Sequence, residues 1–71
     1  MAKYKFKEKE GVTNVMEGDT VVARYKVDYH WQEKNTAVKD NAIYIRLFNG
    51  AKKYIDCKVE LNNDNIQEIP Q

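Results

Sequence analysis

The feature that most constrains the fold of this chain is an unbroken alternation of side-chain types over residues 21–31. Every odd position carries an apolar or aromatic side chain, namely Val21, Ala23, Tyr25, Val27, Tyr29 and Trp31. The even positions are Val22, Arg24, Lys26, Asp28 and His30. Successive side chains of a β-strand point to opposite faces, whereas a helix would scatter these apolar residues around its circumference. The pattern therefore predicts one strand whose odd positions are sheltered in a core and whose even positions meet solvent.

The length of the chain limits how it can be stabilised. A chain of 71 residues buries only about 60% of its unfolded surface, so residues 1–71 are expected to form one small domain with a thin core. Cys57 is the only cysteine, so no internal disulfide forms, and a single cysteine with a single histidine does not supply a zinc cage. We expect no metal and no cofactor, and a fold stabilised by apolar packing or by self-association.

The charge balance bears on location and partners. Twelve basic and eleven acidic side chains give a net charge of +1, whereas a nucleic-acid-binding domain commonly has a larger basic excess. No apolar run approaches the roughly 20 residues of a membrane span, and no signal-peptide core follows Met1. With a lone cysteine favouring a reducing compartment, we expect a cytoplasmic protein with no membrane partner. A protein partner is favoured over nucleic acid, and a homodimer is an alternative.

Glycine and polar residues divide the rest of the chain into short segments. Tyr4 and Phe6 alternate with lysines, which predicts a short strand with a cationic outer row typical of a protected sheet edge. Residues 8–19 are expected to form a packed loop or one helical turn. As a single strand, residues 21–31 would extend about 36 Å, at about 3.3 Å per residue, so we expect a bend or bulge near the middle.

Two further segments are assigned less uniquely. Residues 32–41 are polar and predict a loop, with a brief strand at Ala37 and Val38 as an addition. Residues 62–69 form either a capped helical turn or a last short strand over 66–69, and Pro70 ends both alternatives.

The strongest hairpin signal is Asn49-Gly50 between two apolar runs, residues 42–48 and 51–61. A two-residue turn would put the apolar sets of the two strands on opposite faces. A three-residue loop over residues 48–50, with Gly50 left-handed, puts them on one face, so burial favours this register. The shared face would hold Ile43, Ile45, Leu47, Ile55, Cys57 and Val59, with Ile43 opposite Ile55. On the other face, Tyr44 would lie opposite Tyr54 and Arg46 opposite Lys52.

These segments predict an all-β fold: a single-domain antiparallel meander, or an SH3-like or OB-like barrel of four or five strands, with at most a short helical turn. The segment from Gly18 to Tyr25, followed by Asp28 and Trp31, resembles the first strands of Tudor and other SH3-like barrels. The resemblance covers less than half of the chain and implies a fold rather than a function. The aromatic cage of that family does not map onto residues of this sequence.

The residues capable of catalysis do not form a recognisable set. His30 is a candidate general base with Asp28 beside it, but alternation places Cys57 in the core and His30 on the outer face. The sequence has no calcium-loop spacing, phosphate loop, dinucleotide fingerprint or nucleophile elbow. We therefore expect no enzymatic activity.

An aromatic and cationic surface is the main candidate for function. The predicted patch consists of Tyr44, Tyr54, Arg46 and Lys52, extended by Arg24 and Lys26. Tyrosine rings with interleaved cations suit stacking on bases or on a peptide, although cross-strand tyrosines also simply stabilise sheets. Trp31 is expected in the core, with an exposed anchor for a partner as the alternative.

Two functions are compatible with this surface. The first is a non-enzymatic binding module that recognises a protein or a nucleic acid through the predicted patch. The alternative is a small accessory protein, of the kind that phages and mobile elements encode, that binds and inhibits or adapts a host enzyme.

Overall fold

The structure is a computed structural model that describes residues 3–50 and 53–70, and these residues form strands and turns without a helix. The strands are β1 (Tyr4–Lys9), β2 (Val12–Glu17), β3 (Thr20–Val27), β4 (Gln32–Lys39), β5 (Ala42–Phe48), β6 (Tyr54–Glu60) and β7 (Ile66–Ile69). The all-β class is confirmed, but the seven strands exceed the four or five predicted. None of the described segments forms a helix that would be able to cross a membrane.

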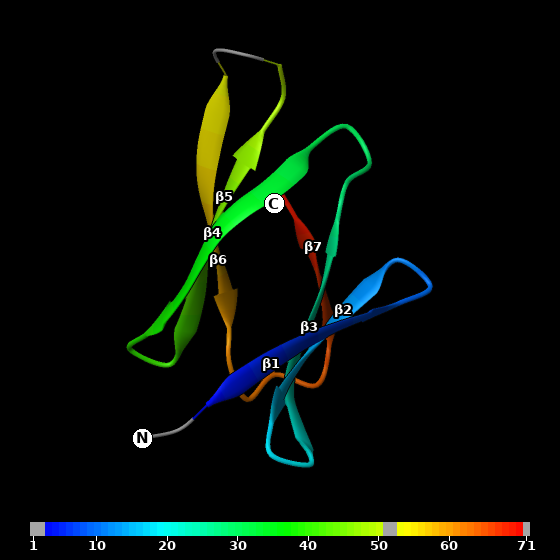
Figure 1. The fold of residues 1–71 in the computed structure, drawn as a ribbon, viewed down its shortest axis with the longest axis vertical. Coiled ribbons are helices and arrows are strands. Elements are labelled where there is room, and N and C mark those ends of the chain that lie inside the picture. Colours follow the sequence, from blue (N-terminus) through cyan, green and yellow to red (C-terminus); the bar gives the residue numbers. More distant parts are fainter. Residues whose placement is uncertain (1–2, 51–52, 71) are drawn as a thin grey trace.

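The strands form two sheets (Figure 1). The first sheet has the order β1-β2-β3-β7, and the second has the order β4-β5-β6. β1 to β3 and β4 to β6 are two antiparallel meanders, whereas β7 pairs with β3 in parallel. Among the described strands no ladder joins the two sheets, so they pack as layers rather than closing through backbone hydrogen bonds.

The core lies between the inner faces of the two sheets. The first sheet contributes Val15, Val22, Ala23, Tyr25 and Ile69, and the second contributes Ile43, Ile45, Leu47 and Val59. All nine are at most 9% exposed. Trp31 packs half-buried against this cluster, which confirms its predicted place at the core. Because both inner faces are buried against each other, the outer faces of the two sheets lie on opposite sides of the molecule.

The strict odd-and-even rule for residues 21–31 is wrong at one point within β3. Val15 pairs with Ala23 and Met16 pairs with Val21, so Val22 is an extra residue on β3. This bulge turns Val22 inward beside Ala23 and leaves Val21 37% exposed, and it lies at the start of the segment rather than near the predicted middle.

The same rule is wrong beyond Val27, because β3 ends there instead of continuing to residue 31. The Asp28 carboxylate accepts a hydrogen bond from the His30 backbone N–H at 3.0 Å, and the Asp28 carbonyl accepts one from the Trp31 N–H at 3.0 Å. This turn points Tyr29 into solvent, where it is 88% exposed.

Two segments predicted as loops are strands, because their turns are tighter than expected. Glu10 and Gly11, with φ of 54° and 81°, connect β1 to β2. Asp40 and Asn41, with φ of 54° and 61°, connect β4 to β5 in the same way. Two consecutive residues with positive φ form the two-residue hairpin turn that matches strand twist. Residues 12–17 and 32–39 are therefore paired strands, and residues 66–69 form the strand alternative, β7.

The β5–β6 hairpin has the predicted faces but a different register. Ile43 lies opposite Val59 rather than Ile55, and Arg46 lies opposite Asp56. β5 ends at Phe48 and β6 begins at Tyr54, which differs from the predicted three-residue loop, and the Asn49 N–H donates to the Lys53 carbonyl at 3.1 Å. A shift by an even number of residues leaves every side chain on the same face, so burial alone does not distinguish the two registers.

Side-chain and loop contacts hold the two sheets together at their margins. The buried Tyr25 hydroxyl on β3 donates a hydrogen bond to the Glu33 carboxylate on β4. Beyond β6, the Asn62 N–H donates to the Val22 carbonyl at 2.6 Å. These contacts couple the first sheet to both ends of the second.

Candidate functional site

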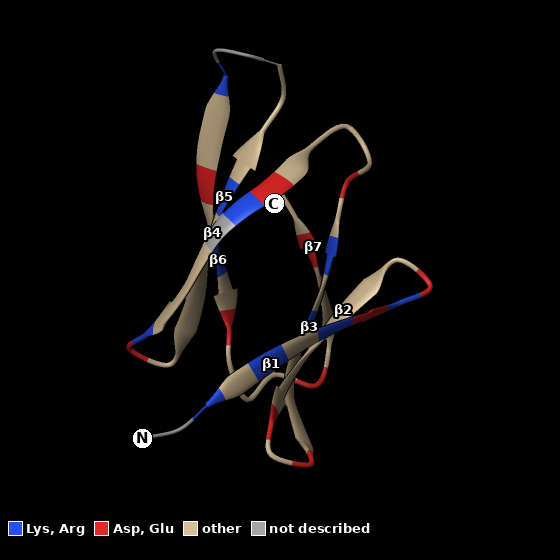
Figure 2. Ribbon diagram, viewed as in Figure 1, with Lys and Arg blue, Asp and Glu red and all other residues tan. Residues whose placement is uncertain are grey.

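The candidate site is the solvent-exposed face of the second sheet, which we call the outer patch. It consists of Lys34 on β4, Tyr44, Arg46 and Phe48 on β5, and Tyr54, Asp56 and Lys58 on β6. These residues share a face because they alternate with the inner residues of β5 and β6, and because Lys34 pairs with Arg46. Charges of both signs are carried by this sheet (Figure 2).

The centre of the outer patch is Arg46, which two neighbours on β6 hold in place. Its Nε lies 2.7 Å from Oδ1 of Asp56 and its Nη2 lies 3.2 Å from Oδ2, which is a two-point contact. The guanidinium carbon lies 4.4 Å from the centroid of the Tyr54 ring. The hydrogen bonds with Arg46 lower the pKa of Asp56 and raise the pKa of Arg46. An arginine fixed by a carboxylate and a ring is preorganised, because less side-chain freedom remains to be lost on binding.

A second cation–aromatic contact continues the row. Nζ of Lys34 lies 5.4 Å from the centroid of the Phe48 ring, and the Phe48 and Tyr54 centroids are 6.1 Å apart. Tyr54 is 54% exposed and Tyr44 is 38% exposed. The outer patch therefore presents two neighbouring rings, Phe48 and Tyr54, with a cation against each of them.

The structure brings together three of the predicted site residues and separates two others. Tyr44, Tyr54 and Arg46 lie on the outer patch as predicted, although Tyr44 is opposite Lys58 rather than Tyr54. Lys52 lies outside the residues that the structure describes.

Arg24 and Lys26 are on β3 in the first sheet, alternating with buried Ala23 and Tyr25, so they face the opposite side of the molecule. The prediction that they extend the patch is wrong. Strand alternation gave their orientation correctly but not the sheet to which they belong.

Four residues of the outer patch are not predicted from the sequence: Lys34, Phe48, Asp56 and Lys58. The sequence predicts a loop at Lys34 and the hairpin turn at Phe48. Asp56 had a usable signal, because opposite charges on directly opposed residues favour a register. A register that sets Arg46 against Asp56 also keeps the apolar residues of both strands on one face.

The two candidate catalytic residues lie on separate elements. His30 is exposed in the turn after β3, with its ring centroid 3.9 Å from that of Tyr29. Cys57 is half-buried on the inner side of β6. Burial, together with the charge of Asp56, raises the pKa of the Cys57 thiol and so disfavours the nucleophilic thiolate. In the described part of the chain, no three His, Cys, Asp or Glu side chains are grouped to hold a metal ion.

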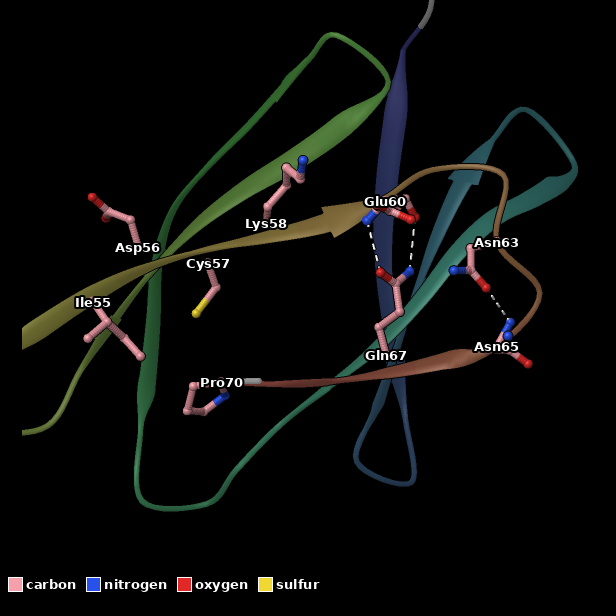
Figure 3. Close-up of a pocket in the computed structure, with 9 residues that line it drawn as sticks. All are labelled: Ile55, Asp56, Cys57, Lys58, Glu60, Asn63, Asn65, Gln67 and Pro70. Atoms are coloured by element: carbon pink, nitrogen blue, oxygen red, sulfur yellow. Dashed lines mark hydrogen bonds between the residues drawn. The ribbon is translucent and has the colours of Figure 1, made fainter.

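A groove of about 570 Å³ runs between β6 and the segment containing β7. Figure 3 shows the side chains of Ile55 and Cys57 pointing from β6 toward Pro70. At one end, the side-chain amide of Gln67 makes two hydrogen bonds with the backbone of Glu60. It donates to the carbonyl and accepts from the N–H, each at 2.9 Å.

Comparison of the chain with protein-family models, with curated proteins and with solved structures finds no match.

Proposed function

We propose that this chain is a non-enzymatic binding module that recognises a protein partner through the outer patch. The observation that carries the proposal is the arrangement of Arg46 between the Asp56 carboxylate and the Tyr54 ring on an exposed sheet face. Tyrosine and arginine are enriched among the residues that dominate protein–protein binding energy, especially where they are held rigidly. An exposed sheet face with such residues suits a partner surface better than a small molecule.

The chemistry of the outer patch favours a protein over a nucleic acid. Proteins that stack bases offer open aromatic faces along a strongly basic groove. Here Arg46 already lies over Tyr54 and Lys34 over Phe48, so one face of each ring is taken by a cation of the same chain. Asp56 also offsets the charge of Arg46.

The raised pKa of Cys57 supports a binding role over a catalytic one, since a protonated thiol is a weak nucleophile. A reducing cytoplasm suits a chain whose only cysteine is Cys57.

Affinity purification from the native cell, with recovered protein and nucleic acid both analysed, tests the proposal. We expect a protein to be recovered with the natural chain, and its yield to fall at least about tenfold with Tyr54→Ala, the loss typical of a binding hot spot. Arg24→Ala is the matched control, because it removes an exposed residue from the opposite face.

Three results would separate the alternatives. Equal recovery by Tyr54→Ala and the natural chain would contradict binding through the outer patch. Salt-sensitive recovery of RNA or DNA without a protein would contradict a protein partner. Recovery of one host enzyme in stoichiometric amount, with its activity lowered by the chain, would favour the accessory-inhibitor function.

A further inference from the structure

β6 is an edge strand of the second sheet, and half of its backbone groups have no partner among the strands that the structure describes. In an antiparallel ladder, residues alternate between pairs that exchange both backbone hydrogen bonds and pairs that exchange none. The hydrogen bond from the Asn49 N–H to the Lys53 carbonyl shows that the opposed residues 49 and 53 form a bonded pair. Every second residue along β6 is then also bonded, so the backbone groups of Ile55, Cys57 and Val59 bond to β5. The N–H and C=O groups of the even residues therefore point away from β5, toward the groove.

Glu60 verifies this phase, because its N–H and C=O both point at the open edge and both meet the amide of Gln67. Gln67 thus occupies the position that the next strand would take, at one end of β6 only. The backbone groups of Asp56 and Lys58, further along the same edge, face the groove, and none of the described strands lies beside them.

Burial along the inner face of β6 follows the same division. Val59, next to the end capped by Gln67, is fully buried. Cys57 and Ile55, on the same inner face, are only half-buried and line the groove. The inner face is therefore incompletely covered along the stretch where the edge is open.

We propose that the occupant of this edge is a second copy of the chain, whose β6 pairs antiparallel with the first around a two-fold axis at Cys57. The phase of the ladder requires an even residue to bond an even residue. This register places Asp56 opposite Lys58 of the second copy, and the symmetry repeats that pair in reverse. Gln67, which occupies the edge at Glu60, limits the shared ladder to residues 55–59 of each strand. Each pair exchanges two backbone hydrogen bonds and sets opposite charges face to face.

The charges of the edge are what select a second copy over an unrelated strand. An interface around a two-fold axis must be self-complementary, and adjacent even positions of opposite charge satisfy that condition. The paired sheet then carries a row of charges of alternating sign, formed by Arg46, Asp56 and Lys58 of the second copy. On the inner side, half-buried Ile55 and Cys57 lie beside the added strand, which covers the surface that they expose to the groove.

Sedimentation equilibrium of the full chain over a wide concentration range tests the proposal directly. We expect a reversible equilibrium between a monomer of 8.4 kDa and a species of twice that mass. A monomer at every concentration would overturn self-pairing and leave the edge to a strand of a different protein. This result would not bear on the outer patch, because partner recovery is measured separately.

Charge variants test the register. Lys58→Glu sets the introduced acid opposite Asp56 of the second copy, and Asp56→Lys sets the introduced base opposite Lys58 of the second copy. Each variant thus places like charges face to face at two symmetric positions, so each alone should dimerise about tenfold more weakly. An equal mixture of the two restores opposite charges at both places and should recover the heterodimer. A mixture that associates no better than the separate variants would overturn the register. Lys26→Glu is the matched control, because it makes the same charge change on β3 and should leave the dimer unaffected.

Cys57 provides a second, independent readout of the register. Opposed residues at a pair without backbone bonds have Cα atoms about 4.5 Å apart, within the range that a disulfide spans. Diamide, which oxidises two thiols to a disulfide while being reduced, should therefore cross-link the natural dimer but not Lys58→Glu at the same concentration. A sample that sediments as a dimer and gives no cross-link would contradict the two-fold axis at Cys57.

Discussion

Replacing Gln67 by methionine isolates the contact that joins the end of β6 to β7. Methionine has nearly the same length and shape, so the substitution removes the hydrogen bonds while keeping the packing. The two bonds to Glu60, each at 2.9 Å, contribute about 0.5–1.5 kcal/mol apiece to folding. Because Glu60 is exposed, water solvates its freed N–H and C=O groups, which places the expected loss near the lower end, at about 1–2 kcal/mol.

Urea denaturation, analysed as a two-state transition, measures this loss, and hydrogen exchange at the Glu60 amide locates it. A loss of 1 kcal/mol lowers Tm by roughly 4–8 °C in a domain of this size. Unchanged stability, with the Glu60 amide still protected in Gln67→Met, would show that the side-chain amide does not cap the edge.

Gln67→Glu makes the stability contributed by the same contact depend on pH. At neutral pH the introduced carboxylate accepts from the Glu60 N–H but does not donate to the Glu60 carbonyl, so the variant is less stable than the natural chain. Below about pH 4 the carboxyl group gains a proton and regains a donor. The stability difference should therefore shrink as the pH falls, and a difference independent of pH would contradict the contact.

Two further predictions concern the sheet contacts. Tyr25→Phe removes the hydrogen bond to Glu33 and should cost about 1–2 kcal/mol in urea denaturation. Burial is the main cause of the raised pKa of Tyr25, and Glu33 is the second cause. The contribution of the protonated Tyr25 hydroxyl to stability is therefore complete below about pH 10 and is lost as the pH rises further. The natural chain should lose stability above pH 10 more steeply than Tyr25→Phe, and parallel profiles would refute this. Arg46→Ala should raise the pKa of Asp56 toward that of an isolated aspartate in an NMR titration, since Arg46 is the main cause of its lowering. An unchanged titration would mean that the pair does not persist in solution.

The sequence predicts which faces are buried better than it predicts where strands end. The residues predicted to be buried on β5 and β6 are correct, because a register shift by an even number of residues leaves each side chain on the same face. The bulge at Val22 breaks that period within β3, and only the pairing with β2 reveals where the extra residue lies. The turn at Asp28 interrupts an alternation that continues in the sequence as far as Trp31.

The outer patch was predicted only in part, for a related reason. Tyr44, Arg46 and Tyr54 follow from alternation along β5 and β6. Lys34 depends on a hairpin whose turn, Asp40-Asn41, lacks the glycine that makes such turns easy to recognise. Sheet order decides which outward-facing strands lie side by side, and the local sequence carries little information about sheet order.

The parallel pairing of β7 with β3 sets an order of assembly. β3 spans Thr20–Val27 and β7 spans Ile66–Ile69, so the whole second sheet is translated between the two partners. Until residues 66–69 have left the ribosome, the hydrogen-bonding side of β3 that β7 will occupy stays open, and Ile69 is missing from the core. Such long-range closure slows folding. A nascent or truncated chain lacking these four residues would carry an unprotected strand, the kind of species that chaperones retain and that aggregates when they do not.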